Sequence, residues 1–284
     1  MRPHPRSRVA VVTDSTAALP PQVASYYGLS VVPLRLQIGA DETDEARADP
    51  EEIASALRAD TVVTTSEPPS AEFFWAYRDA AVSGCSEVVS LHISGRLSKT
   101  SESAREAAAR ATVPVHVVDS LTSGMSLGFL AVAACEAAAA GASAAQIVRL
   151  LEDRRRYASQ MIYVDTLEHL RRGGRIGKAA ALLGTALSIK PLLGLSGGEI
   201  VPLAKVPGTG RALAKLVDVG VKQWHRQPTD AAVEYFDEPE RAELVAGRLR
   251  ARMPQLRRLV VTRGSAVIAA HVGPGAVGLA ISPC

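Results

Sequence analysis

The sequence has few cysteines and little net charge, and each shortage excludes a class of protein. Its three cysteines, Cys85, Cys135 and Cys284, are far apart, without the spacing of a disulfide framework, a redox motif or a metal site. The net charge of +3 is too small to indicate nucleic acid as a partner. We therefore expect a reduced protein that binds neither a metal nor nucleic acid.

Long hydrophobic runs are also missing. The Ala-rich stretch 127–140 contains Glu136, and no run approaches the length that stable membrane insertion needs. The apolar run near the start ends at Asp14, which is too short for a secretory signal. With 47% hydrophobic and 21% charged residues, the chain has the composition of a folded globular protein. We expect it to be soluble and cytoplasmic.

The first half of the chain alternates between strand and helix patterns. The predicted strands are 9–13, 31–36, 87–93 and 115–119, and the predicted helices between them are 71–82 and 101–111. Apolar strands separated by helices are typical of a parallel sheet that is covered on both faces. The helices expected from Met125 to about Tyr157 complete this half.

The second half has strands that follow one another directly and strands that helices separate. The predicted strands are 161–164, 189–195, 199–206, 231–236, 257–263 and 266–272. This order favours a mixed sheet with helices on one side. We therefore predict an α/β protein with a three-layer, parallel-sheet domain at 1–156 and a two-layer α/β domain with a mixed sheet at 157–284.

Hydroxyl groups follow several predicted strands of the first half. The run at Val62–Thr64 leads into Thr65 and Ser66, and the next strand leads into Ser94, Gly95 and Ser98. The strand that ends at Asp119 leads into Ser120. Ligands of open parallel sheets bind at the carboxyl ends of strands, and hydroxyls with free N–H groups suit a carboxylate or phosphate. Helix N-capping is the alternative for each single loop.

A glycine pair surrounded by cations lies in the second half. A short helical pattern stops at Gly173-Gly174, and a second apolar helix is expected at Ala179–Leu187. The cations are Arg171, Arg172, Arg175 and Lys178. The group suits an anionic ligand or a protein partner, and a solvated basic face is the alternative.

His271 stands before a Gly-Pro-Gly turn, at the end of the predicted strand 266–272. A rigid turn holds such a side chain in place, so this histidine is the best candidate for a functional role. A histidine that is hydrogen-bonded only for structure is the alternative.

Three segments match known sequence motifs only in part. The run Gly273–Gly278 spells a dinucleotide fingerprint, but the six residues after it leave no room for a βαβ unit. The run 172–179 lacks the first glycine and the final hydroxyl of a P-loop. The run Gly124–Gly128 matches a nucleophile elbow, although Ser126 lies eight positions beyond Val118 in the preceding strand.

An acid, Asp165 or Asp237, and then His271 follow Ser126 in the order typical of hydrolases. A serine hydrolase that acts on a lipid ester, with Ser126 or Ser94 as the nucleophile, is therefore the alternative function.

Seven segments in order carry a resemblance to a known family. They are TDSTAALP (13–20), TSEPPS (65–70), ISGRLSKT (93–100), VVDS (117–120), LRRGGRIGKAAALLG (170–184), IKPLL (189–193) and HVGPGAVG (271–278). Together they resemble the DegV family, whose fatty-acid-binding proteins serve a fatty acid kinase in many bacteria. The resemblance covers nearly the whole chain.

The resemblance implies a long-chain fatty acid in a buried tunnel between the two domains, its carboxylate held by Thr and Ser hydroxyls and a histidine. Motif matching gives Thr65, Ser94, the Gly95 N–H and His271 as the carboxylate ligands. To these we add the neighbouring hydroxyls of Ser66, Ser98 and Ser120.

The resemblance also implies a partner protein. Arg175 falls where the family meets its kinase, and we assign Arg172 and His271 to the same surface. A dihydroxyacetone-kinase-like fatty acid kinase would then form the acyl phosphate. The chain itself would be a lipid-binding protein and no enzyme, with the fatty acid as its ligand and no cofactor.

This chain departs from the family pattern at four positions. Glu67 stands where the family usually has Gln, and Pro69 where it has Ser. Lys99 replaces a common glycine, and Pro207 replaces an arginine that is expected at the kinase-facing surface.

Overall fold

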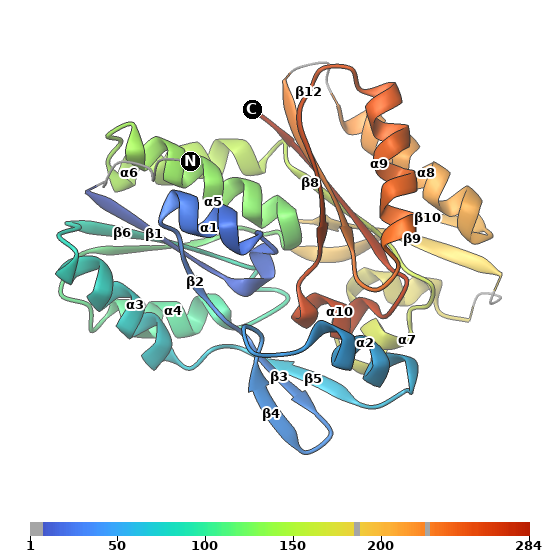
Figure 1. Ribbon diagram of the computed structural model, residues 1–284, viewed down its shortest axis with the longest axis horizontal. Coiled ribbons are helices and arrows are strands. Elements are labelled where there is room, and N and C mark those ends of the chain that lie inside the picture. The colour runs from blue at the N-terminus through green and yellow to red at the C-terminus, as the bar shows by residue number, and fades with distance from the viewer. Residues whose placement is uncertain (1–7, 185–187, 225–227) are drawn as a thin grey trace.

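A parallel sheet forms the centre of the first half of the molecule (Figure 1). The computed structural model describes residues 8–184, 188–224 and 228–284. The sheet has the order β2-β1-β6-β7, and every neighbouring pair in it is parallel. Its strands are β1 (Val9–Asp14), β2 (Ser30–Val32), β6 (Glu87–His92) and β7 (Val115–Asp119).

Helices cover both faces of this sheet. One face packs against α1 (Pro21–Tyr27), α5 (Gly124–Ala139) and α6 (Ala144–Arg155). The other packs against α3 (Ser70–Val82) and α4 (Thr100–Ala108). Burial on both faces explains why these strands read as continuous apolar runs. The predicted three-layer arrangement is confirmed.

A mixed sheet forms the second half, in the order β10-β9-β8-β13-β11-β12. Its strands are β8 (Ser159–Tyr163), β9 (Ile189–Ser196), β10 (Glu199–Pro207), β11 (Thr229–Tyr235), β12 (Leu256–Arg263) and β13 (Val277–Pro283). Among the described strands of this sheet, only β11 and β12 pair in parallel. One face packs on α8 (Thr209–Gln223) and α9 (Pro239–Arg252), and α5 of the first half packs on the other face. The predicted mixed, two-layer arrangement is confirmed.

A small antiparallel sheet, β4-β3-β5, lies apart from the parallel sheet (Figure 1). Its strands are β3 (Arg35–Ile38), β4 (Asp41–Asp44) and β5 (Val63–Ser66). The predicted single strand 31–36 is therefore wrong: Pro33 separates β2 from β3 and lacks the N–H that a ladder needs. The placement of Thr65 at the edge of the parallel sheet is also wrong, since β5 pairs with β3.

The segment predicted as strand 266–272 is helix α10 (Ala266–Val272). Ser265 caps it, because its hydroxyl accepts a hydrogen bond from the N–H of Ile268. The Gly-Pro-Gly turn then leads into β13, which the sequence analysis missed. His271 thus lies in the last turn of a helix that packs against β5, α7 (Glu168–Arg172) and α2 (Pro50–Arg58).

The glycine pair ends α7 as predicted, with Gly174 in the left-handed region at φ 68°. The helix expected at Ala179–Leu187 is instead a 3-10 helix, η2 (Gly177–Leu182), and residues 185–187 lie outside the described ranges. Gly184, at φ 78°, follows this short helix.

We call residues 8–156 the N-terminal part and residues 157–284 the C-terminal part, and we propose the division between them as the domain boundary.

Candidate functional site

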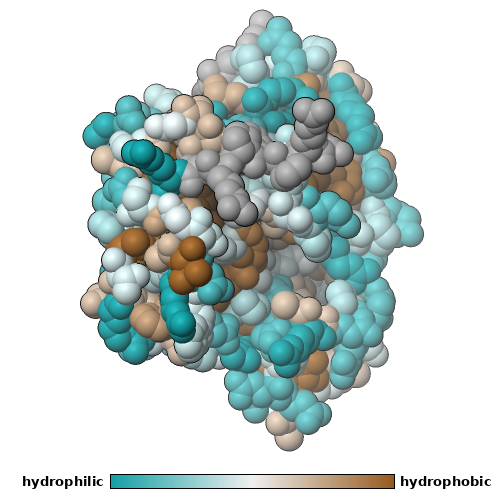
Figure 2. Space-filling view, turned by 60° about the vertical axis from the view of Figure 1, so that its left-hand side comes forward, coloured by the Kyte–Doolittle hydropathy of each residue, from teal (hydrophilic) through white to brown (hydrophobic). Residues whose placement is uncertain are grey.

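A largely apolar cavity lies between the two parts of the chain. Its empty space, counting the open space at its mouth, is about 810 Å³. Its apolar wall includes Leu34, Ile93, Leu97, Leu170, Leu195 and Phe236. On the face seen in Figure 2, hydrophobic residues gather toward a hollow in the middle, and hydrophilic residues surround it.

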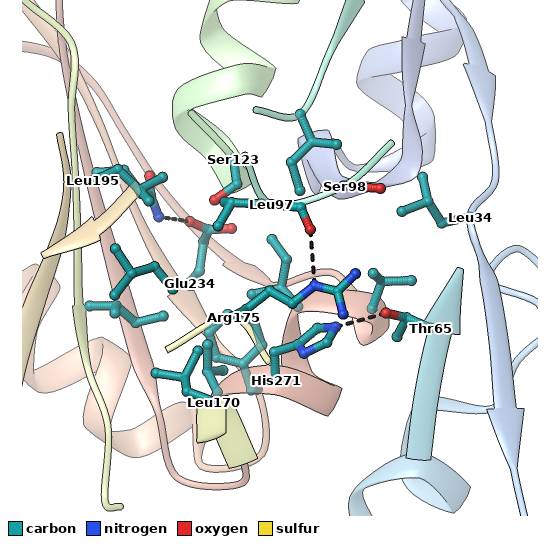
Figure 3. A pocket seen from close by; sticks show the side chains of 18 of the residues that line it. Leu34, Thr65, Leu97, Ser98, Ser123, Leu170, Arg175, Leu195, Glu234 and His271 are labelled. Carbon is teal, nitrogen blue, oxygen red and sulfur yellow. Dashed lines mark hydrogen bonds between the residues drawn. The ribbon is translucent and has the colours of Figure 1, made fainter. Parts of the chain in front are cut away.

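Thr65, Arg175 and His271 meet in the wall of this cavity (Figure 3). They come from β5, the loop after α7, and α10. Nε2 of His271 lies 2.7 Å from Oγ1 of Thr65. Thr65 and His271 were both predicted as carboxylate ligands, and the fold places them in contact although 206 positions separate them.

His271 is a neutral group at ordinary pH. Burial, and then the positive charge of Arg175, lower its pKa to about 4. A neutral imidazole has one N–H group, so either tautomer leaves one donor of the Thr65–His271 pair unused. If Nε2–H donates to Thr65, the hydroxyl hydrogen of Thr65 is available to a ligand. If Thr65 donates to Nε2, the hydrogen lies on Nδ1, which has no partner among the described residues.

Gly173 lies directly against the ring of His271 because it has no side chain. A Cβ at this position would overlap Nδ1 of His271. Gly173 has an ordinary φ of −74°, so space, and not backbone conformation, requires glycine here.

Arg175 connects the two parts of the chain beside the cavity. Its Nε donates to the carbonyl oxygen of Leu97 at 3.0 Å, and its Nη1 donates to that of Gly173 at 2.7 Å. The remaining N–H donors of the guanidinium make no hydrogen bond within the described residues, and they can meet an anion.

A second hollow shares Thr65, Arg175 and His271 with the cavity. Its other wall includes His169 and the exposed Arg172. Arg172 forms ion pairs with Asp60 and Glu168, so its charge is already partly balanced. The three shared residues therefore lie between an apolar cavity and a more polar hollow.

The other predicted ligand residues divide into two groups. Ser66 and Ser98 line the cavity, and Oγ of Ser98 lies 2.8 Å from Oγ1 of Thr100. Ser94, Gly95 and Ser120 are not in its wall.

Each of the residues outside the wall has a partner already. The Ser94 hydroxyl is buried and donates to the carbonyl oxygen of Gly198 at 2.8 Å. The N–H of Gly95 donates to Asp119, and the hydroxyl of Ser120 donates to the carbonyl oxygen of Thr122. Ser94 nevertheless adjoins the cavity, because Ile93 precedes it and Leu97 follows on the same loop.

Three further polar residues of the cavity wall, Ser123, Gln160 and Glu234, were not predicted from the sequence. Nε2 of Gln160 donates to Oε2 of Glu234 at 2.9 Å. Burial raises the pKa of Glu234 to about 7. The signal was present in the sequence: a single acidic residue stands in the otherwise apolar strand 231–236.

Two glycines of the rejected motifs make room for this carboxyl group. A Cβ on Gly124 would lie 2.7 and 2.8 Å from the oxygens of Glu234, and one on Gly278 would lie 3.1 Å from Oε2. Gly124 also has a φ of 60°. These positions therefore require glycine for packing, and this accounts for the resemblance to a nucleophile elbow and to a dinucleotide fingerprint.

The groups of the alternative hydrolase are not bonded to one another. Oγ of Ser126 is buried and has no partner within the described ranges, and Ser94 bonds to Gly198. Asp165 bonds to Tyr163 and Arg241.

A different Ser–His–Asp array does occur, at Ser90, His92 and Asp14. Nε2 of His92 lies 2.7 Å from Oγ of Ser90, and its Nδ1 lies 3.1 Å from Oδ2 of Asp14. All three side chains are fully buried, so no substrate reaches the serine. The array joins β1 to β6 inside the N-terminal part.

In the described part of the chain, no three His, Cys, Asp or Glu side chains gather as a metal site would require. Within the same ranges, none of the helices has both the length and the apolar character to cross a bilayer.

Comparison with known proteins agrees with this architecture. The model of a family described as "Uncharacterised protein, DegV family" matches residues 8–283. A DegV domain-containing protein of Streptomyces coelicolor is 45% identical over 275 residues, which cover 96% of this chain and 98% of the relative.

Two solved structures are also similar. A DegV family protein of Thermus thermophilus, described as binding fatty acid, has a TM-score of 0.92 and 32% identity, over 98% of this chain and all of that one. DegV of Bacillus subtilis, described as a fatty acid binding protein, has a TM-score of 0.86 and 29% identity, again over 98% and 100%.

Proposed function

Because the chain belongs to the DegV family, we propose that it binds a long-chain fatty acid in the cavity and presents the carboxyl group to a partner kinase. The observation that carries the proposal is the position of Thr65, Arg175 and His271 between the apolar cavity and the polar hollow. An acyl chain fits the first environment and a carboxylate fits the second.

The two ends of the ligand have different roles. Burying about fifteen methylenes at ~0.8 kcal/mol each contributes roughly 12 kcal/mol before the costs of binding. Hydrogen bonds to the carboxylate contribute about 1.5–3 kcal/mol each, and much of this offsets desolvation. The tail therefore sets the affinity, and the polar residues determine where the carboxyl group lies.

We assign the carboxylate to the unused donor of the Thr65–His271 pair and to the free N–H groups of Arg175. Ser66 and Ser98 lie in the same wall. Ser94 joins the set if its hydroxyl turns from Gly198 toward the cavity. Arg175 thus contacts the ligand in this proposal, and it also lies where we expect a partner to dock.

The partner kinase carries out the phosphoryl transfer. In a dihydroxyacetone-kinase-like fatty acid kinase, an oxygen of the carboxylate attacks the terminal phosphorus of ATP and ADP leaves, which produces an acyl phosphate. This chain holds the nucleophile in place at the polar hollow beside Arg172.

The first test is mass spectrometry of organic extracts from protein purified without detergent. We expect one long-chain fatty acid per chain. If a folded protein carries no lipid and takes up no added palmitic acid, the proposal is wrong.

The second test adds a fatty acid kinase of this class, ATP and hydroxylamine to the palmitate-loaded protein. Acyl hydroxamate should form only when both proteins are present. We expect Arg172→Ala to slow its formation and to leave palmitate binding unchanged. A kinase that works equally well on free palmitate would contradict the role in presentation.

A further inference from the structure

A polar pair lies across the cavity from the proposed carboxylate site. Figure 3 shows the carboxyl group of Glu234 on the opposite side from Thr65 and His271, close to Ser123. Glu234 is completely buried and Gln160 is 8% exposed, and both line the cavity. An acyl chain that extends from the Thr65 side would meet this pair farther along its length.

Structural roles account for only one of the three side-chain oxygens in this pair. Oε2 of Glu234 accepts a hydrogen bond from Gln160, and the backbone N–H of Met125 donates to the same carboxyl group. Oε1 of Glu234 and Oε1 of Gln160 are buried and have no partner among the described residues. Two unsatisfied acceptors in a cavity wall are costly beside a plain hydrocarbon, because they lose water and gain nothing.

We propose that the cavity selects a fatty acid with a hydroxyl group on its tail, and that Glu234 and Gln160 bind this hydroxyl. The inference rests on the proposed function, since it concerns the far end of the same ligand. A hydroxyl donates one hydrogen bond and accepts others, so it can bond to Oε1 of either residue.

The chemistry of the pair disfavours a second carboxylate and an unmodified methyl end. A second carboxylate would face Glu234 and add like charge in a buried site. An unmodified methyl end offers no donor. Because burial raises the pKa of Glu234 to about 7, its protonated form also occurs near neutral pH, and this form can donate to the hydroxyl oxygen. A hydroxyl can therefore form a hydrogen bond with Glu234 in both its charged and its protonated form.

The test compares ω-hydroxylauric, ω-hydroxymyristic and ω-hydroxypalmitic acids with lauric, myristic and palmitic acids on the wild-type protein. The series is needed because the hydroxyl must reach the pair. For at least one length we expect the hydroxy acid to bind roughly tenfold more tightly than its parent. In a cavity without polar partners the hydroxyl would weaken binding at every length.

Gln160→Met removes one acceptor and the amide donor, and it keeps the length of the side chain. It should reduce the preference for the hydroxy acid about threefold or more, while Gln22→Met, the same change at an exposed position of α1 outside the cavity wall, should leave it unchanged. If Gln160→Met fails to fold, Gln160→Leu serves the same purpose, because it also removes the acceptor and the amide donor at this position.

The outcomes separate this inference from the proposed function. If the parent acids bind and no hydroxy acid is preferred, this inference is wrong and the proposed function stands. A preference of equal size in wild type and Gln160→Met would also overturn it. If no acid of either series binds, the proposed function fails as well.

Discussion

Thr65 and His271 are in hydrogen-bond contact across the fold, with 2.7 Å between Oγ1 and Nε2. The threonine belongs to the small antiparallel sheet and the histidine to the last turn of α10. This contact fixes the position of a strand of the N-terminal part against a helix of the C-terminal part. The proposed carboxylate site therefore depends on the same contact that helps to hold these elements together.

Replacing Thr65 by valine should weaken both ligand binding and stability. The change keeps the shape and leaves Nε2 of His271 without its partner, which we expect to cost about 1–3 kcal/mol. Palmitate affinity should fall roughly tenfold. Calorimetric titration and urea unfolding measure the two effects. Thr64→Val, at the exposed neighbouring position, is the control. Equal affinities of the two variants would remove Thr65 from the site.

Gly173→Ala should displace the ring of His271. The added methyl group would overlap Nδ1, and we expect a loss of about 1–3 kcal/mol in the free energy of unfolding and weaker palmitate binding. Gly210→Ala in α8 is the matched control, because a Cβ there meets nothing within 4 Å. Helix propensity should make that variant about 0.5–1 kcal/mol more stable than wild type. The prediction fails if Gly173→Ala behaves like the control.

Glu234→Gln should change how stability depends on pH. Burial raises the pKa of Glu234 from the usual 4.5 to about 7 in the folded protein. Between these values the folded protein keeps a proton that the unfolded chain has lost, so this group makes the protein less stable as pH rises. Relative to Glu234→Gln, wild type should lose roughly 3 kcal/mol between pH about 4.5 and about 7.

His271 acts in the opposite direction over a similar range. Its pKa is lowered from 6.5 to about 4, so its contribution to stability is lost as pH falls through this range. The wild-type curve therefore contains two opposed terms, and the difference between wild type and Glu234→Gln isolates the glutamate. Urea unfolding at several pH values measures it, with the exposed Glu243→Gln as the control for a lost charge. A pH-independent difference would show that the carboxyl group titrates normally.

Ser126→Ala should leave palmitate binding unchanged and raise stability slightly. Its buried hydroxyl has no partner among the described residues, and its removal should gain up to about 1 kcal/mol. Gly124→Ala should be strongly destabilising, because its Cβ would meet the oxygens of Glu234 at φ 60°. Thermal unfolding compares the two. Turnover of a lipid ester by wild type, lost in Ser126→Ala, would instead support a hydrolase.

The sequence predicted the layers of both halves because burial and periodicity are local properties. The prediction failed where one local sequence pattern is compatible with both a strand and a helix. Six of the seven residues in AVIAAHV are apolar, so the run fits a buried strand as well as a short helix, and only the Ser265 cap distinguishes the two. The strand that follows was missed because glycines break its beginning.

Only some residues of the candidate site could be predicted from the sequence. Thr65, Ser66, Ser98 and His271 line the cavity, but the strand that carries Thr65 belongs to a sheet that no local pattern indicated. Glu234 stands out in its apolar strand, but its contact with Gln160 depends on the pairing of β8, β13 and β11, which are distant in sequence. Long-range pairing of this kind has no signature in a single sequence.

The backbone N–H of Met125, in the first turn of α5, bonds to the carboxyl group of Glu234, which belongs to β11. A helix of the N-terminal part therefore begins against a side chain that the C-terminal part supplies. Recombination that joined one part to an unrelated second part would leave this helix start without its acceptor and would bury the carboxyl group without its donor. We therefore expect the two parts to be inherited together, and glycine at position 124 to be retained wherever position 234 is glutamate.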